Sequence, residues 1–548
     1  MSGKKRSEEI REESNMVSRR GFLKTAGILA AGTAFASTTA CADSGDQQTP
    51  EWLPGTWERE ADIVIVGMGS AGLGATIASL TEDLGEVLVL EVAPEEEAGG
   101  NSRVCGGICM VPDNPDNAIL YQTDLNGSYE VPAENMQAWA EEICKNREWL
   151  EGLGAHLEAT SMASPEFPEC PGADAIKVYL YDGQYGNQLF WTFMKEVAID
   201  NGAHIEYSTR VTRLITNPLT NEVLGVTSED GRNFKARKGV VLACGGFENN
   251  QEMLNQYFRG TASTVLFQGS PYNQGDGIKM AQSVGADLWH MNNYAGIGLS
   301  VRAESPDSRK ATCLRFSSHD HIFVGPDGTR FMYEERNALV RHGYMPIAGG
   351  YDLNSIPFKT YAIYGKEAFE SGLTMLSYNF SGWNSLLGPT PEPEPAAYID
   401  KGIVFVADTP RELAEKIGIN PEGLENTLAT YATYVENNSD PEFGKGRALF
   451  APGEPEPRVP AFTLEAIEPP YYAMEICHTL LNSQGGPRRS PLGEVLDTEG
   501  NPILRLYAAG EMGCEYSFIY NGGGNFSEAM SSGRIAARNA ATNEVWAL

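Results

Sequence analysis

The chain has 548 residues, of which 42% are hydrophobic and 21% are charged. This length and composition are ordinary for a globular protein with two or more buried cores, and they argue against a disordered chain. The formal net charge of −32 argues against nucleic acid as a partner, because phosphate binding needs a basic surface.

The first 40 residues have the pattern of an export signal. Residues 18–24 read Ser-Arg-Arg-Gly-Phe-Leu-Lys and precede a weakly apolar run, 25–40, that is too short for a permanent membrane span. We expect residues 1–40 to be a twin-arginine signal peptide, a route that exports proteins already folded around a cofactor. The protein is then expected at the outer face of the cytoplasmic membrane or in the cell envelope.

A short polar segment, 41–56, follows and is predicted to be a linker. Its first residue, Cys41, is a candidate for lipid attachment, which would make the protein a lipoprotein. None of the nine cysteines forms Cys-x-x-Cys or Cys-x-x-Cys-His, so covalently attached haem c is excluded. Cys105 and Cys109 are a weak local pair, which leaves an iron–sulfur cluster as an alternative to buried free thiols. Disulfide bonds between these cysteines are a further alternative, because an exported protein meets an oxidising compartment. The spacing of the histidines does not indicate a metal site.

A dinucleotide-binding motif begins after the β-branched run 61–66, which predicts a buried parallel strand. In Gly67-x-Gly69-x-x-Gly72, the first glycine permits a tight turn, the second lets the backbone approach a pyrophosphate, and the third allows close helix packing. A second predicted strand, 86–90, ends in Glu91, whose carboxylate can accept from ribose hydroxyls.

Further Gly-rich segments are spread over the chain at 99–107, 243–246, 275–277, 509–511 and 520–527. Together with the first motif they resemble the FAD-binding segments of the fumarate reductase and 3-ketosteroid dehydrogenase flavoprotein superfamily. The resemblance implies non-covalent FAD, and only one dinucleotide motif is complete, so a second site for NAD(P)H has no support. The implied cofactor-binding residues are Gly67, Gly69, Ser70, Ala71, Gly72, Glu91, Gly99, Gly100, Asn101, Ser102, Gly106, Gly107, Val211, Ala243, Gly245, Gly246, Gly277, Gly510, Glu511, Asn525, Phe526 and Ser527.

The fold class follows from these segments. We predict an α/β protein with a doubly wound, Rossmann-type FAD-binding domain made of 57–293 and 473–548. An α+β capping domain, 294–472, would be inserted between the two parts. The substrate would lie between the cap and the flavin, because concave sites form at domain interfaces.

The resemblance also implies catalytic residues. Tyr520 and Gly524 keep the spacing of the Tyr and Gly that hold a substrate ketone in ketosteroid dehydrogenases, and their O–H and N–H would stabilise negative charge on a carbonyl oxygen. The family's proton donor follows a motif Arg-Phe-x-Asn-Glu, here 330–334 with Tyr333 in place of Asn. Arg336 matches that donor after a small gap.

Alternatives to these assignments remain open. Without the gap, the position of the proton donor is Ala338, and Arg341 or Tyr344 would substitute. Arg336 is equally explained as an ordinary ion-pairing residue. Tyr333 either contacts substrate or carries a proton, or it is a packed core tyrosine.

Three positions that bind a dicarboxylate in fumarate reductases are uncharged here: Ile297, Asn482 and Asn521. Because a buried carboxylate without cationic partners costs several kcal/mol, the substrate is predicted to be a small neutral carbonyl compound. We expect hydride transfer from FAD N5 to the C=C bond of an enone or unsaturated lactone, steroid-like as in cardenolides, with a separate membrane-bound electron donor such as a cytochrome. The alternatives are a 3-ketosteroid dehydrogenase running the reverse reaction and a lipid-anchored electron-transfer or ligand-binding flavoprotein, and a fumarate reductase is least favoured.

Overall fold

The computed structural model describes residues 50–547 except 187, 259–264, 268, 297–298, 303–304, 307–308, 310, 317, 349, 354–355, 358 and 377–394. The predicted signal peptide 1–40 and Cys41 lie outside these residues. Residues 51–548 form one unit. Within its described part, none of the helices has the length and apolar character needed to cross a membrane.

The main sheet is built around five parallel strands. In spatial order they are β25 (Pro502–Ala508), β9 (Asn233–Leu242), β1 (Arg59–Val66), β2 (Val87–Leu90) and β6 (His204–Glu206). An antiparallel pair, β7 (Val211–Thr216) and β8 (Val223–Ser228), continues from the first half of β9, and β24 (Glu494–Leu496) pairs antiparallel with β25. Because the chain leaves β1 toward β2 and later returns on its other side as β9, β1 marks the point where strand order reverses, and ligands bind outside the carboxyl ends of such strands.

Side chains of β1 alternate between two cores. Ile63 and Ile65 belong to one buried cluster, whereas Val64 and Val66 belong to another on the opposite face. The first cluster joins the sheet to α2 (Ser70–Thr81), α7 (Leu189–Asp200) and α13 (Gly524–Ala541), and the second joins it to α8 (Gln251–Tyr257) and α9 (Asp276–Ser283). The apolar run predicted as a buried parallel strand is therefore covered on both faces.

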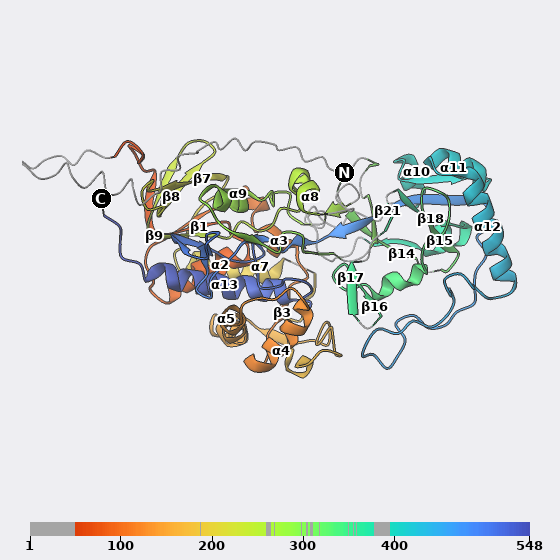
Figure 1. Cartoon of the computed structure of the whole chain (residues 1–548), viewed down its shortest axis with the longest axis horizontal. Helices are drawn as coiled ribbons and strands as arrows, with labels where there is room; N and C mark the ends of the chain where they lie inside the picture. The colour runs from red at the N-terminus through yellow and green to blue at the C-terminus, as the bar shows by residue number, and fades with distance from the viewer. Residues whose placement is uncertain are drawn as a thin grey trace, which may run out of the picture. The chain divides into compact units, whose positions relative to one another are not determined.

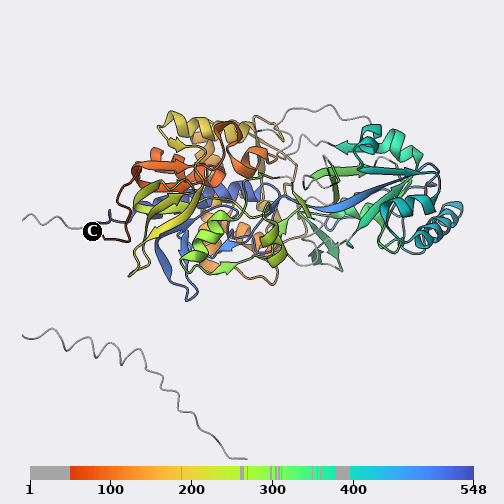
Figure 2. The ribbon, with the colours of Figure 1, turned by 90° about the horizontal axis from the view of Figure 1, so that it is seen from above.

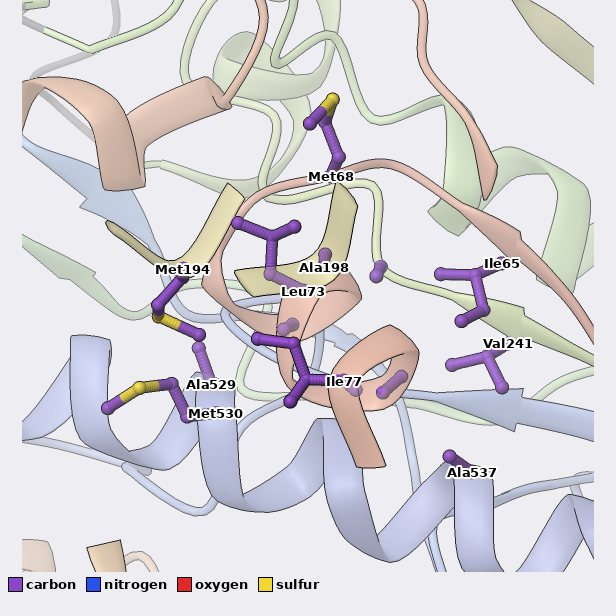
Figure 3. Close-up of a cluster of buried hydrophobic side chains, with 14 of the residues drawn as sticks. Ile65, Met68, Leu73, Ile77, Met194, Ala198, Val241, Ala529, Met530 and Ala537 are labelled. Atoms are coloured by element: carbon purple, nitrogen blue, oxygen red, sulfur yellow. The ribbon is translucent and has the colours of Figure 1, made fainter. Parts of the chain in front are cut away.

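Helices α2 and α13 lie in close contact. Figure 3 shows Met530 and Ala529 of α13 beside Leu73 and Ile77 of α2, with Met194 of α7 completing the cluster. Two glycines make this approach feasible: a β-carbon at Gly74 would lie 2.6 Å from the Met530 carbonyl oxygen, and one at Gly533 would lie 2.1 Å from the Ala71 carbonyl oxygen. Backbones packed at this distance leave no room for side chains.

A second sheet is organised around the long strand β21 (Tyr471–Leu480). Its first half pairs antiparallel with β18 (Thr360–Tyr364) and β20 (Val404–Ala407), and its second half pairs with β13 (Leu299–Arg302) and β10 (Val265–Phe267). Outer strands are β15 (His321–Val324), β14 (Ala311–Phe316) and β19 (Leu373–Leu376). In Figures 1 and 2 the blue strand β21 runs among green and cyan strands from the middle of the chain.

Three helices accompany the second sheet: α10 (Pro395–Asp400), α11 (Pro410–Ile417) and α12 (Pro421–Glu436). Leu413 of α11 and Leu424 of α12 pack with Ile322 and Ile363 of its strands. The chain thus has a parallel sheet with helices on both faces and a separate mixed sheet with its own helices. This arrangement confirms the predicted fold class. The predicted boundary at 473 falls inside β21, and β10 from the first predicted segment pairs with the same strand.

Further elements complete the structure. The helices are α3 (Gly100–Val104), α4 (Pro115–Asn126), α5 (Ala133–Ile143) and α6 (Asn146–Gly152), with the tighter 3₁₀ turns η1 (Glu95–Glu97), η2 (Ala173–Ala175) and η3 (Glu334–Leu339) and the wider π-helical turn η4 (Ala368–Gly372). The strands are β3 (Ile108–Met110), β4 (Leu157–Ala159), β5 (Val178–Tyr181), β11 (Leu288–Trp289), β12 (Tyr294–Ala295), β16 (Tyr344–Ile347), β17 (Gly350–Leu353), β22 (Asn482–Ser483) and β23 (Gly486–Pro487).

Candidate active site

A large cavity opens at the carboxyl ends of the central parallel strands. It is lined by residues that directly follow β1, β2 and β9, and by residues at the start of α13. The predicted cofactor-binding residues that line it are Gly67, Gly69, Ser70, Ala71, Glu91, Gly100, Asn101, Ser102, Gly106, Gly107, Val211, Ala243, Gly245, Gly510, Glu511, Asn525 and Phe526. One cavity thus brings together segments that are far apart in the sequence.

The other predicted cofactor-binding residues support the wall from behind. A β-carbon at Gly72 would lie 1.9 Å from the Gly67 carbonyl oxygen, and one at Gly99 would lie 2.4 Å from the Trp191 ring. Gly246 and Gly277 are equally crowded, against the Ser483 hydroxyl and the Met512 sulfur. Ser527 donates to the sulfur of Cys109 at 3.2 Å. These five residues shape the site without lining the cavity.

The turn between β1 and α2 presents backbone to the cavity. Gly69 precedes the first residue of α2, and the Ser70 N–H donates to the Ser102 hydroxyl at 2.8 Å. Buried Glu91 accepts from the N–H groups of Met68 at 2.9 Å and Ala93 at 3.0 Å. Burial raises the pKa of the Glu91 carboxyl, and the two N–H groups oppose this rise. The positive end of a helix dipole beside a fixed acid fits the pyrophosphate and ribose of a dinucleotide.

A buried polar network surrounds Asn101. Its amide donates to Glu248 at 2.8 Å and to Glu511 at 3.1 Å, and Asn273 donates to the same oxygen of Glu248 at 2.6 Å. Burial raises the pKa of both carboxyls, and the neighbouring Glu248 raises that of Glu511 further. The Glu511 carboxyl lines the cavity, where its oxygens can accept from a chain of hydroxyl groups such as the ribityl group.

Asn525, at the start of α13, carries an unused acceptor. Its amide nitrogen donates to the Asn482 side chain at 3.0 Å. Its amide oxygen is buried and has no hydrogen-bond partner among the residues that the structure describes. A flavin ring offers N–H donors for such an acceptor, so this end of the cavity also fits FAD.

Tyr520 lines the same cavity and is only 6% exposed. Its ring stacks between Tyr516, with centroids 5.4 Å apart, and His342, with centroids 4.3 Å apart. Gly524, the first residue of α13, does not line the cavity, and its N–H donates to the Asn521 carbonyl oxygen at 2.9 Å. The structure therefore brings the predicted tyrosine donor to the cavity, while the predicted backbone donor closes a turn.

The predicted substrate-pocket residues take different places. Asn482 is buried and lines the cavity. Asn521 is fully buried behind it, where its side chain accepts from the Tyr121 hydroxyl at 2.7 Å and the Glu166 N–H at 2.9 Å, and donates to the Ala163 carbonyl at 2.8 Å. It serves as a structural clamp. Ile297 lies outside the described residues.

The residues predicted in the cap are not brought to the cavity. Tyr333 is buried and donates to the Arg447 carbonyl at 2.9 Å, as a packed core tyrosine would. Arg336 is exposed on η3. Arg341 is buried but pairs with Glu169 at 3.1 Å and Glu454 at 3.4 Å.

Comparison with known proteins identifies the family. A family model described as an FAD binding domain matches residues 62–527. The chain belongs to this FAD-binding family. It is accordingly an FAD-dependent oxidoreductase that acts on CH–CH bonds, as are the reductases and dehydrogenases of the family that it resembles.

Several proteins with similar sequences or folds are reductases or dehydrogenases. The chain is 28% identical to the digoxin reductase of Eggerthella lenta, over 96% of this chain and 97% of that protein. Its fold matches the crystal structure of 3-ketosteroid Δ1-dehydrogenase from Sterolibacterium denitrificans with TM-score 0.65 and 21% identity, over 88% and 99% of the two chains. It also matches the open conformation of a flavocytochrome c3 fumarate reductase with TM-score 0.61 and 22% identity, over 88% and 78% of the chains.

A histidine that sequence reasoning missed also lines the cavity of this FAD-binding protein. His342 Nε2 lies 2.7 Å from Oε2 of Glu166, which also accepts the Gly522 N–H at 2.7 Å. Burial raises the pKa of the Glu166 carboxyl, but the His342 imidazole and the Gly522 N–H outweigh it and hold this pKa below its usual value. No local motif connects Glu166, His342 and Tyr520, which come from three distant segments.

The cysteines of this FAD-binding protein show no cluster geometry in the described part. The cysteines whose side chains the structure describes are all free thiols. Of Cys105 and Cys109, Cys105 lines the cavity and Cys109 does not. No group of three or more His, Cys, Asp or Glu residues among the described side chains is arranged to hold a metal ion. The structure of this part therefore gives the iron–sulfur alternative no support.

Proposed function

We propose that the protein is an exported flavin-dependent reductase of the activated C=C bond in a neutral enone or unsaturated lactone, with a steroid-like substrate. The similarity to digoxin reductase over nearly the whole length of both proteins supports this substrate class. Tyr520 and His342 line the same cavity as the residues suited to FAD, and they offer polar groups to a carbonyl compound there.

The observation that carries the proposal is the scarcity of positive charge around the cavity. Among the described residues that line it, only Arg210 and His342 can carry a positive charge. Arg210 is paired with Asp276 at 2.8 Å, and His342 with Glu166. A dicarboxylate would leave at least one carboxylate without a cationic partner, whereas a ketone or lactone requires only hydrogen-bond donors.

Different residues of the chain would bind FAD and polarise the substrate carbonyl. Gly67, Gly69, Asn101 and Asn525 would hold FAD without a covalent bond, and FAD would supply the hydride that reaches the β-carbon. The Tyr520 hydroxyl would donate to the substrate carbonyl oxygen and stabilise the negative charge that develops there, a contribution on the order of 2 to 4 kcal/mol.

Electron supply and location are part of the same proposal. An exported enzyme without a second dinucleotide motif needs an external reductant, which we propose to be a membrane-bound donor such as a cytochrome. Replacement of Arg19 and Arg20 by Lys should abolish export of the folded protein, measured as FAD fluorescence in the envelope fraction against the cytoplasm. Unchanged export would refute the twin-arginine assignment.

An anaerobic screen tests the substrate class. The purified protein is reduced until its flavin absorbance is bleached, and fumarate, urocanate, an unsaturated ketosteroid and a cardenolide are added separately. We expect reoxidation by the steroid-like compounds and none by fumarate. Fast reoxidation by fumarate would overturn the proposal, and no reoxidation by any compound would favour an electron-transfer or ligand-binding flavoprotein.

The second candidate is a 3-ketosteroid dehydrogenase that runs the reaction in reverse. The position of Tyr520 in the cavity supports both directions, because the same donor stabilises the enolate in each. Oxidised protein mixed with a saturated 3-ketosteroid distinguishes them, since only a dehydrogenase would bleach its flavin at a useful rate.

A further inference from the structure

Reduction of a C=C bond requires a proton as well as a hydride, and the cap arginines do not reach the cavity. Arg336 is exposed on η3, and Arg341 is held between Glu169 and Glu454. The next residue, His342, lines the cavity. We propose, on the basis of the proposed reductase function, that His342 donates the proton to the α-carbon of the substrate and that Glu166 is its positioning residue.

Backbone geometry fixes His342 at this place. Arg341 and Tyr344 exchange backbone hydrogen bonds at 2.8 and 2.9 Å, so His342 and Gly343 form the tip of a two-residue turn. Both tip residues have positive φ, 50° at His342 and 90° at Gly343. Glycine adopts this conformation freely, but a histidine there is uncommon and strained. Strain of this kind is often found where a side chain must be aimed.

The two ring nitrogens of His342 have different surroundings. Nε2 lies 2.7 Å from Glu166, whereas Nδ1 is buried and has no partner among the residues that the structure describes. A carboxylate on Nε2 fixes the orientation of the imidazole ring. Nδ1 is therefore the ring nitrogen left without a protein partner among the described residues.

The surroundings leave the pair isolated from other cations. The ring of Tyr520 covers one face of the imidazole. The Glu166 carboxylate is held by the Gly522 N–H and is 18% exposed, and the His342 side chain is 14% exposed. The nearest further charges are Arg341 and Arg458, and both are paired with Glu454. The pair can thus exchange its proton with solvent while remaining largely shielded from it.

The proton balance of the step is simple. As hydride arrives at the β-carbon, the π electrons of the substrate move onto the α-carbon and its carbonyl, which Tyr520 polarises. The Nδ1–H bond of the imidazolium breaks and a C–H bond forms at the α-carbon. Neutral His342 stays hydrogen-bonded to Glu166 and regains its proton from solvent.

The test compares His342→Gln, Glu166→Gln and a control, His156→Gln, because His156 is exposed and lies beside Asp182 at the surface. With FAD content equal in all forms, His342→Gln should slow substrate-dependent flavin reoxidation by about 100- to 10,000-fold, and the control should not. In His342→Ala, added imidazole should restore part of the rate.

A second readout uses the FAD-loaded chain and does not depend on turnover. Nitrogen-15 NMR of labelled histidines, with His342 assigned from the His342→Gln spectrum, should show the ring nitrogen signals of His342 displaced in Glu166→Gln and those of His156 unchanged. If no enone reoxidises wild-type flavin, the proposed function fails, and the NMR comparison alone decides whether Glu166 positions His342. A His342 signal that ignores Glu166→Gln, or a His342→Gln variant that reacts at the wild-type rate, overturns the inference.

Discussion

Gly533 of α13 packs directly against the carbonyl oxygen of Ala71 in α2, where a β-carbon would lie only 2.1 Å away. Both helices begin at the cavity, α2 behind Gly69 and α13 behind Gly523. The contact therefore fixes the distance between the two helix N-termini that face the cofactor.

Gly533→Ala should force these helices apart. Overpacking of this kind costs about 1 to 3 kcal/mol, and we expect a lower midpoint in urea unfolding together with reduced FAD content after purification. Gly152→Ala is the matched control, because a β-carbon there meets nothing within 4 Å. Equal midpoints and FAD content in the two variants would contradict the proposed role of the contact.

Asn521→Ala should destabilise the wall behind the substrate space. It leaves the Tyr121 hydroxyl and the backbone groups of Ala163 and Glu166 without their partner, at a cost of about 1 to 3 kcal/mol for an unsatisfied buried group. Urea unfolding measures this loss, with exposed Asn201→Ala as the control. A residue that instead bound substrate would change KM without lowering stability.

Tyr520→Phe should lower turnover by about 100-fold or more while FAD content stays constant, because it removes a hydroxyl from the cavity and keeps the ring between Tyr516 and His342. Stopped-flow reoxidation of the reduced flavin by an enone is the measurement. An unchanged rate would remove Tyr520 from the reaction.

Glu335 gives a pH-dependent prediction away from the cavity. Burial opposes its ionisation, but Lys445 at 3.6 Å and His319 at 3.0 Å lower the pKa of its carboxyl from 4.5 to about 2. The ionised form is favoured in the folded state, so the stabilisation is complete above pH 4.5 and is lost as pH falls toward 2.

Glu335→Gln should thus lower the free energy of unfolding at pH 7 by up to about 3 kcal/mol. It should also flatten the decline in stability between pH 4.5 and 2. Urea titrations at pH 7, 4.5 and 3 test both effects, with exposed Glu58→Gln as control. An unchanged acid profile would show that Glu335 is not stabilised by its neighbours.

The fold and the cofactor end of the cavity were predictable because their signals are local. A β-branched strand, a glycine turn and an acid about twenty residues later are read from one short segment. Two of the three glycines lie against a backbone carbonyl, Gly67 against that of Ala243 and Gly72 against that of Gly67.

The substrate end was not predictable in the same way. His342, Glu166 and Tyr520 come together only in the folded chain. The neighbouring Arg341 matched the expected chemistry by residue type, but its charge is paired with Glu169 and Glu454. The predicted role of the Gly524 N–H also depended on a local geometry, the turn with Asn521, that spacing alone does not reveal.

Strand β21 has a mechanical consequence. It forms the centre of the second sheet, and the chain continues from its last residue, Leu480, directly into Leu481 and Asn482 of the cavity wall. An extended strand that is hydrogen-bonded on both sides stretches little. A displacement of this sheet along the strand would therefore be transmitted to Asn482 and, through its hydrogen bond, to Asn525 at the start of α13.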